Sequence, residues 1–117
     1  MFVGVCRLAL HLRGNSSLKG KRGIVRKVVE RTRAKFNASV AEVGDNDAWQ
    51  RAVVGITVVG NSAAHVDSML AKIGGFIERI GVAPVISWET EVIPLGGEIG
   101  TEHPFEGADD PNLWEEQ

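Results

Sequence analysis

Apolar residues recur at three- and four-residue steps in two stretches of the chain, the spacing that is typical of amphipathic helices. The first stretch runs from Ser17 to Phe36 and the second from about Ser62 to Ile80. Four other segments alternate apolar and polar residues or are rich in β-branched residues, as strands are. The expected strands cover residues 2–12, 38–43, 50–60 and 82–95. The predicted order of elements is therefore β-α-β-β-α-β.

This order, with a hairpin at its centre, predicts an α+β ferredoxin-like sandwich. We expect a four-stranded antiparallel sheet with two helices on one face and an open second face. Residues 1–95 would form this domain. Residues 96–117 hold seven acids, no Lys or Arg, two prolines and four glycines, and they predict an acidic C-terminal extension.

The single cysteine, Cys6, excludes an internal disulfide and is typical of a reducing compartment. Apolar runs are too short to span a bilayer, and Arg7 and His11 interrupt the first of them, so no secretory signal is expected. We therefore expect a cytoplasmic protein that does not associate with membranes.

Charge is distributed unevenly between the two halves of the chain. Residues 1–51 hold eleven Lys/Arg and four Asp/Glu, whereas residues 52–117 hold two and eleven. Much of the positive charge lies on the first expected helix, where like charges four residues apart repel each other and do not stabilise the helix. This asymmetry indicates a surface for a polyanion, and phosphate contacts with RNA are expected from Lys19, Lys21, Arg22, Arg26, Arg31 and Arg33.

Two alternatives to RNA contact apply to this basic helix. It could be a solvated face, partly neutralised by the acidic half of the chain. The acidic extension could also dock on it in cis, as a mimic of nucleic acid, or bind another protein instead.

The open sheet face offers a second surface. Arg7, His11 and Arg51 are expected there, beside Glu89 and Glu91 of the last strand. The central strand positions carry no aromatic residues, which excludes the base-stacking sheet of RNA-recognition motifs. Cross-strand ion pairs or a homodimer contact are expected instead.

The sequence offers no strong catalytic or cofactor motif. The three histidines are scattered without zinc-ligand spacing, and no nucleophile triad or phosphate-binding glycine loop stands out. Cys6 is expected to be a buried, inert thiol, and Trp49 to close the end of the core, with an interface anchor as its alternative. A non-catalytic protein without cofactor or metal is predicted.

Three separated motifs give the chain a family resemblance: SLKGKR at 17–22, FNASVAEV at 36–43 and WQRA at 49–52. Residues 1–94 resemble the YlxP-like family, also called domain of unknown function 503. Gly20 stands where an acid is common in that family, which removes a capping box. The resemblance implies a small bacterial ferredoxin-like protein without assigned catalytic residues, often encoded beside translation and ribosome-assembly factors.

The leading hypothesis is thus a protein that binds structured RNA or the ribosome. The alternatives are a homodimeric protein-interaction scaffold that uses the open sheet face and, with less support, a small-molecule or regulatory domain.

Overall fold

The computed structural model describes residues 1–45 and 47–96. The elements follow the predicted order, and their bounds lie within a few residues of the expected ones. They are β1 (Phe2–His11), α1 (Leu18–Lys35), β2 (Ser39–Gly44), β3 (Arg51–Gly60), α2 (Ala63–Ile80) and β4 (Val85–Pro94).

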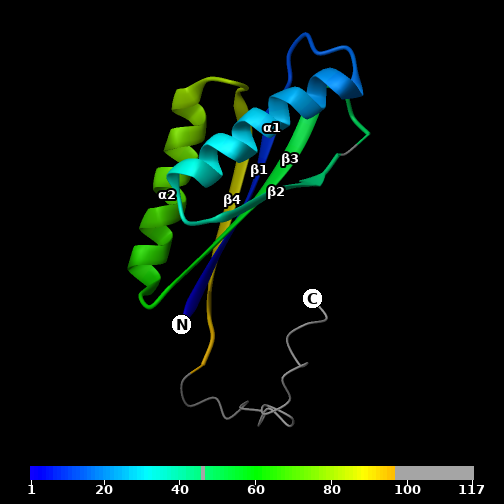
Figure 1. Ribbon diagram of the computed structural model, residues 1–117. Helices are drawn as coiled ribbons and strands as arrows, with labels where there is room; N and C mark the ends of the chain where they lie inside the picture. The colour runs from blue at the N-terminus through cyan, green and yellow to red at the C-terminus, as the bar shows by residue number, and fades with distance from the viewer. Residues whose placement is uncertain (46, 97–117) are drawn as a thin grey trace, which may run out of the picture.

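The strands form one antiparallel sheet in the order β2-β3-β1-β4. β1 pairs with β3 along its whole length, from Phe2 opposite Gly60 to His11 opposite Arg51. Both helices cover the same face of the sheet, and the other face has no helix on it (Figure 1). The split β-α-β arrangement confirms the predicted ferredoxin-like α+β fold for the described residues.

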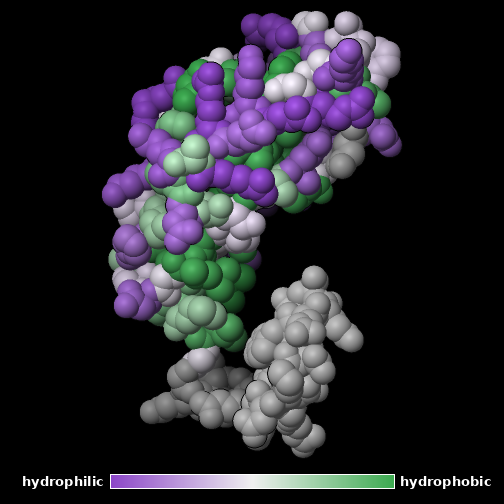
Figure 2. Space-filling view, in the orientation of Figure 1, coloured by the Kyte–Doolittle hydropathy of each residue, from purple (hydrophilic) through white to green (hydrophobic). Residues whose placement is uncertain are grey.

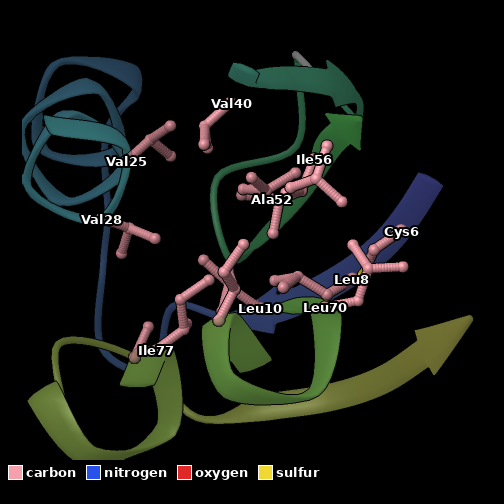
Figure 3. Close-up of a cluster of buried hydrophobic side chains, with 14 of the residues drawn as sticks. Cys6, Leu8, Leu10, Val25, Val28, Val40, Ala52, Ile56, Leu70 and Ile77 are labelled. Atoms are coloured by element: carbon pink, nitrogen blue, oxygen red, sulfur yellow. The ribbon is translucent and has the colours of Figure 1, made fainter. Parts of the chain in front are cut away.

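The core lies between the helices and the sheet (Figure 3). Leu8 and Leu10 of β1 are fully buried, because alternate residues of a strand point to the same face. Val28 of α1 and Leu70 of α2 meet them from the helical layer. Burying a Val or Leu side chain stabilises a fold by about 1.5–3 kcal/mol, so this one apolar layer fixes the helices to the sheet.

Both helices begin at a serine cap, and a glycine ends the second. Ser17 caps α1 by accepting a hydrogen bond from the backbone N–H of Gly20, at 3.0 Å. A side chain at Gly20 would collide with the amide oxygen of Asn15, which explains the glycine at this position. Ser62 caps α2, and Gly81 ends it at a φ of 64°, a conformation that favours glycine.

Gly74, in the middle of α2, allows the helix to pack closely on β4. A Cβ atom at this position would lie 2.5 Å from the ring of Trp88, far inside van der Waals contact. Trp88 therefore takes the space that a side chain would need. The absence of a side chain at Gly74 thus permits close packing of α2 against the sheet.

The acidic extension lies outside the described residues from residue 97 onward. Neither described helix is long and apolar enough to cross a membrane. Among the described residues, no group of three or more His, Cys, Asp or Glu side chains is arranged to hold a metal ion.

Candidate functional site

The exposed face of α1 carries most of the basic side chains of the domain, and hydrophilic residues cover this helix in Figure 2. Gly23, Glu30 and Ala34 lie along the middle of this face, and two ridges of basic residues flank them at helical spacing. We call the exposed basic side chains the α1 basic face. It consists of Lys19, Arg22, Arg26, Lys27, Arg31, Arg33 and Lys35.

The α1 basic face has no ion-pair partner among the described residues, whose three ion pairs involve Arg7, Lys21 and Arg51. The first turn of α1 holds no acid, so Lys19 faces the positive end of the helix dipole. Lys35 has an aromatic neighbour, with its ammonium 5.4 Å from the ring centre of Phe76. Arg33 and Lys35 lie in the last turn, where cations favour the helix dipole, but the face as a whole is not neutralised by an ion pair within the described residues and remains available to an anion.

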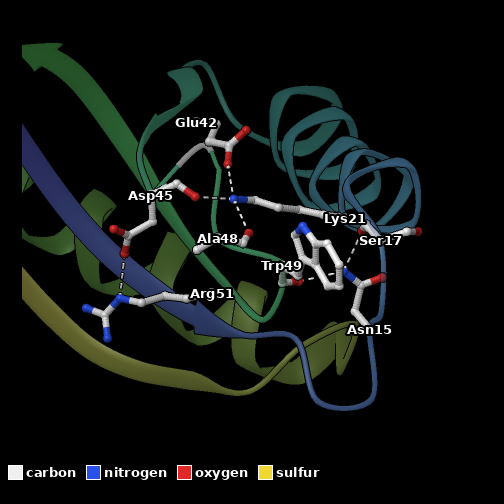
Figure 4. Close-up of polar contacts among 8 residues, drawn as sticks. All are labelled: Asn15, Ser17, Lys21, Glu42, Asp45, Ala48, Trp49 and Arg51. Atoms are coloured by element: carbon white, nitrogen blue, oxygen red, sulfur yellow. Dashed lines mark hydrogen bonds and ion pairs between the residues drawn. The ribbon is translucent and has the colours of Figure 1, made fainter.

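Lys21 does not belong to this face, and the expectation that it contacts phosphate is wrong. Its side chain is only 2% exposed. Its ammonium lies 3.0 Å from a carboxylate oxygen of Glu42 and donates hydrogen bonds to the carbonyl oxygens of Asp45 and Ala48 (Figure 4). Lys21 thus joins α1 to the loop between β2 and β3.

A signal for this burial exists in the sequence. Lys21 stands four residues before Val25 and seven before Val28, on the same stripe that packs into the core. A lysine side chain is usually exposed to solvent, whereas the position of Lys21 on the helix places it on the buried side. The carbonyl groups that receive its ammonium come from the loop at residues 45–50, which only the fold brings near.

Two further contacts fix this loop. Asp45 adopts a φ of 56°, and its carboxylate accepts a hydrogen bond from Arg51 at 2.7 Å. The side-chain amide of Asn15 donates to the carbonyl oxygens of Trp49 and Ser17, at 2.5 and 2.8 Å. The loop is therefore tied to the start of α1 through both Lys21 and Asn15.

Trp49 does not close the end of the core, so that expectation is wrong. The residue is 54% exposed, and its indole lies beside the start of α1, next to Asn15 and Ser17 (Figure 4). It precedes β3 by two residues, so the alternation that points β3 side chains inward does not extend to it. Sequence reasoning identified the residue, but only the structure shows that its ring faces solvent.

The predicted residues of the open sheet face come together as expected. Arg7, His11 and Arg51 lie on the face away from the helices, on β1 and β3, with His11 directly opposite Arg51. The expected cross-strand ion pair is confirmed: Arg7 pairs in register with Glu89, and their charged groups lie 2.7 Å apart. The hydrogen bond from Arg7 to Glu89 raises the pKa of the guanidinium.

A shallow groove of about 420 Å³ runs across this face. Its lining is largely apolar and includes Val5, Ala41 and Val43, with Glu91 at one side. Val43 and Val59 are 57% and 59% exposed. The open face thus combines apolar side chains with charges of both signs.

Cys6 is buried at 4% exposure, on the face that packs against the helices. Burial raises the pKa of its thiol to about 11, because the thiolate would lose its hydration. Since the thiolate is the reactive form, the expectation of an inert thiol is consistent with this environment.

Comparison with known proteins links most of the chain to one family. The sequence model of a family described as "Protein of unknown function (DUF503)" matches residues 3–90. A protein of Bacillus subtilis (strain 168), described as "Uncharacterized protein YlxP", is 37% identical over 62 residues, which cover 53% of this chain and 67% of that protein.

Two solved structures show a distant likeness. One is a NIPSNAP family protein from Agrobacterium tumefaciens, 16% identical, with a TM-score of 0.36 over 88% of this chain and 100% of the other. The second, a dimeric ferredoxin-like protein from an uncultured marine organism, is 12% identical, with a TM-score of 0.35 over 85% and 100%. At these scores the likeness supports no functional inference.

Proposed function

Because the chain belongs to the DUF503 family, which has no assigned activity, its role must follow from its own surfaces, and we propose that it is a non-catalytic RNA-binding protein. It would contact structured RNA or the ribosome through the α1 basic face, in translation or ribosome assembly. The cytoplasmic location expected from the sequence is part of this proposal.

One observation supports the proposal above all others: the α1 basic face is exposed and unpaired within the described residues. Each Lys or Arg that pairs with a phosphate releases condensed counterions, which favours binding at low salt. Of the six residues predicted for phosphate contact, five remain on this face. They are Lys19, Arg22, Arg26, Arg31 and Arg33.

The shape of α1 suits an RNA helix. From Lys19 to Arg33 the helix is about 21 Å long, at a rise of about 1.5 Å per residue. Gly23 has no neighbour near its missing side chain, so the helix surface is low at this point between the two ridges, although Glu30 stands further along the same line. Double-stranded RNA is recognised mainly by its shape and its phosphates, which the basic ridges beside Gly23 can approach closely.

Salt-dependent binding to an RNA hairpin tests the proposal. Affinity is measured by fluorescence anisotropy over a series of salt concentrations for the natural chain and for Arg22→Glu/Arg26→Glu. The double change should lower affinity by about 100-fold or more and reduce the slope of log K against log salt by about 1.4–1.8, as for two lost phosphate contacts. Unchanged affinity would refute the proposal.

A matched control separates a site from overall charge. Lys72→Glu/Arg79→Glu makes the same change in net charge on two exposed residues of α2. This variant should bind RNA within about threefold of the natural chain if contact is confined to α1, because exposed charges beyond a Debye length are screened. An equal loss in both double variants would show that only net charge matters.

The open sheet face supports a second candidate function, a homodimeric scaffold for protein interaction. Its groove lies beside Arg7 and Glu91, so two copies related by a two-fold axis would each offer both charges to the other. Val59→Asp should convert a dimer to a monomer in light scattering, whereas Lys72→Glu, at an exposed residue of α2, should not. A natural chain that is monomeric at high concentration would exclude this candidate.

The acidic extension is a proposed competitor of RNA for the α1 basic face, on grounds of sequence charge alone. Removal of residues 96–117 should then raise RNA affinity most strongly at low salt. Equal affinity with and without these residues would show that the extension does not dock on α1.

A further inference from the structure

We propose that Trp49 is a stacking platform for an unpaired base of the RNA that α1 binds. This inference rests on the proposed function and specifies its ligand: a stem that carries a loop, a bulge or a single-stranded end. The phosphates of the stem would lie on the α1 basic face, and one exposed base would lie flat on the indole.

The indole is exposed while its backbone is held on several sides. Trp49 is 54% exposed, and Asn15 donates a hydrogen bond to its carbonyl oxygen at 2.5 Å. Lys21 holds the carbonyl of the preceding residue, Ala48, at 2.8 Å. Because the backbone is held before a ligand arrives, less conformational entropy is lost on binding than for a residue of a free loop.

Trp49 lies next to the basic helix in space, although the two are distant in sequence. The amide nitrogen of Asn15 bonds to the carbonyl oxygens of both Trp49 and Ser17, and Ser17 is the residue that caps α1. Trp49 therefore lies near the first turn of α1, and Figure 4 shows its indole in the same region as Asn15 and Ser17. A nucleic acid on the first part of the α1 basic face would extend past this ring.

The charges near the ring favour an anionic ligand. Arg13, Lys19 and Arg22 are exposed, and residues 13–22 contain no acid. Asp47, on the loop itself, is the exposed carboxylate nearest in sequence to the ring. Positive charge beside an exposed aromatic ring is the combination by which proteins bind single-stranded nucleic acid, since every base has a face that stacks.

The open sheet face cannot supply this interaction in the manner of RNA-recognition motifs. Its central strands, β1 and β3, present small, β-branched and charged residues there, with His11 at the end of β1, but no Phe, Tyr or Trp. Trp88 is 38% exposed, but its ring packs against Gly74 on the helix-covered side. Within the described residues, Trp49 is thus the exposed indole that adjoins the basic helix.

Two RNA probes with equal numbers of phosphates test this inference. One is a hairpin with an unpaired loop, and the other is a blunt-ended duplex. Trp49→Ala should weaken hairpin binding by about 5- to 150-fold, the range for loss of one stacked base. It should leave duplex binding and the salt slope for the hairpin unchanged, because no phosphate contact is removed.

Two further variants separate stacking from general apolar contact. Trp49→Phe keeps an aromatic face and should restore most of the hairpin affinity, whereas Trp49→Leu should not. The hairpin should also quench the fluorescence of the natural chain more than it quenches that of Trp49→Phe. Thermal unfolding of each variant checks that the domain is intact.

Each outcome decides one of the two proposals. If the natural chain binds neither probe, the proposed function fails. If it binds both probes and Trp49→Ala binds them as tightly as the natural chain, α1 binds RNA and the stacking inference is overturned. Equal weakening of hairpin and duplex by Trp49→Ala would also overturn it, because it would place Trp49 in the structure of the site and not on an unpaired base.

Discussion

Replacing Lys21 with methionine is expected to destabilise the domain strongly, although the change removes only one charge from a basic helix. Methionine fills a similar space within α1 but cannot bond to the loop. The change leaves the Glu42 carboxylate without its ion pair and frees the carbonyl groups of Asp45 and Ala48. The destabilisation would come from the lost bonds between α1 and the loop and not from helix propensity, since Met and Lys are similar helix formers.

The structure sets the size of the effect. Removing one partner of a buried ion pair costs about 3–5 kcal/mol. Glu42 is less buried than Lys21, with 23% of its side chain exposed against 2%. Water can therefore partly rehydrate the carboxylate and the loop carbonyls, which lowers the expected loss in unfolding free energy to about 2–4 kcal/mol.

Chemical and thermal unfolding followed by circular dichroism measure this loss. For a domain of this size, 1 kcal/mol shifts Tm by about 4–8 °C, so a loss of about 3 kcal/mol corresponds to roughly 12–24 °C. Glu42→Gln is the matched control. It keeps Lys21 and both carbonyl contacts and should cost only about 1–2 kcal/mol.

A double-mutant cycle locates the interaction. Lys21→Met/Glu42→Gln should be less destabilising than the sum of the two single changes by about 1–3 kcal/mol, because the two side chains touch. A loss below about 1 kcal/mol for Lys21→Met, or additive effects in the cycle, would contradict the conclusion that this ammonium is part of the interior.

Two further predictions concern the packing of α2 and the buried thiol. Gly74→Ala should destabilise the domain by about 1–3 kcal/mol in urea unfolding, because its Cβ would collide with Trp88. The control is Gly75→Ala, whose Cβ meets only the flexible end of Arg79 and which should be neutral or stabilising by up to about 1 kcal/mol. Equal losses of stability in the two variants would refute the packing argument. Cys6 should resist thiol reagents at pH 8 in the native chain and react on unfolding, because burial raises the pKa of its thiol to about 11. Since the thiol pKa is higher in the folded chain, the stability contributed by the neutral thiol should be complete below about pH 8.5 and be lost as the pH rises toward 11. Rapid reaction of Cys6 with a thiol reagent in the native chain at pH 8 would contradict its burial.

Hydrophobic periodicity was sufficient to predict the fold of the described residues. Alternation along residues 2–12 and the three- and four-residue spacing in both helices reflect which side chains face the core, so the order of elements and the ferredoxin-like topology followed directly. The ion pair between Arg7 and Glu89 was predictable too, because neighbouring strands bring alternate residues to one face.

The site was only partly predictable, because two of its residues depend on contacts between distant segments. Lys21 was expected at the surface on account of its charge, but the β2–β3 loop supplies partners that make its burial favourable. Trp49 was expected in the core on account of its size, but it lies before the first residue of β3, where a loop and Asn15 determine its direction. The loop carbonyls that bind Lys21 lie 24 and 27 residues away in sequence, and Asn15 lies 34 residues from Trp49.

Placing both helices on one side of the sheet gives the chain two outward surfaces that point in opposite directions (Figure 1). A partner on the α1 basic face and a partner on the open sheet face would not compete for space. If two copies joined through their sheets, their basic helices would face away from each other. Such a pair would be a bridge between two RNA segments, and its avidity would depend on the distance between those segments.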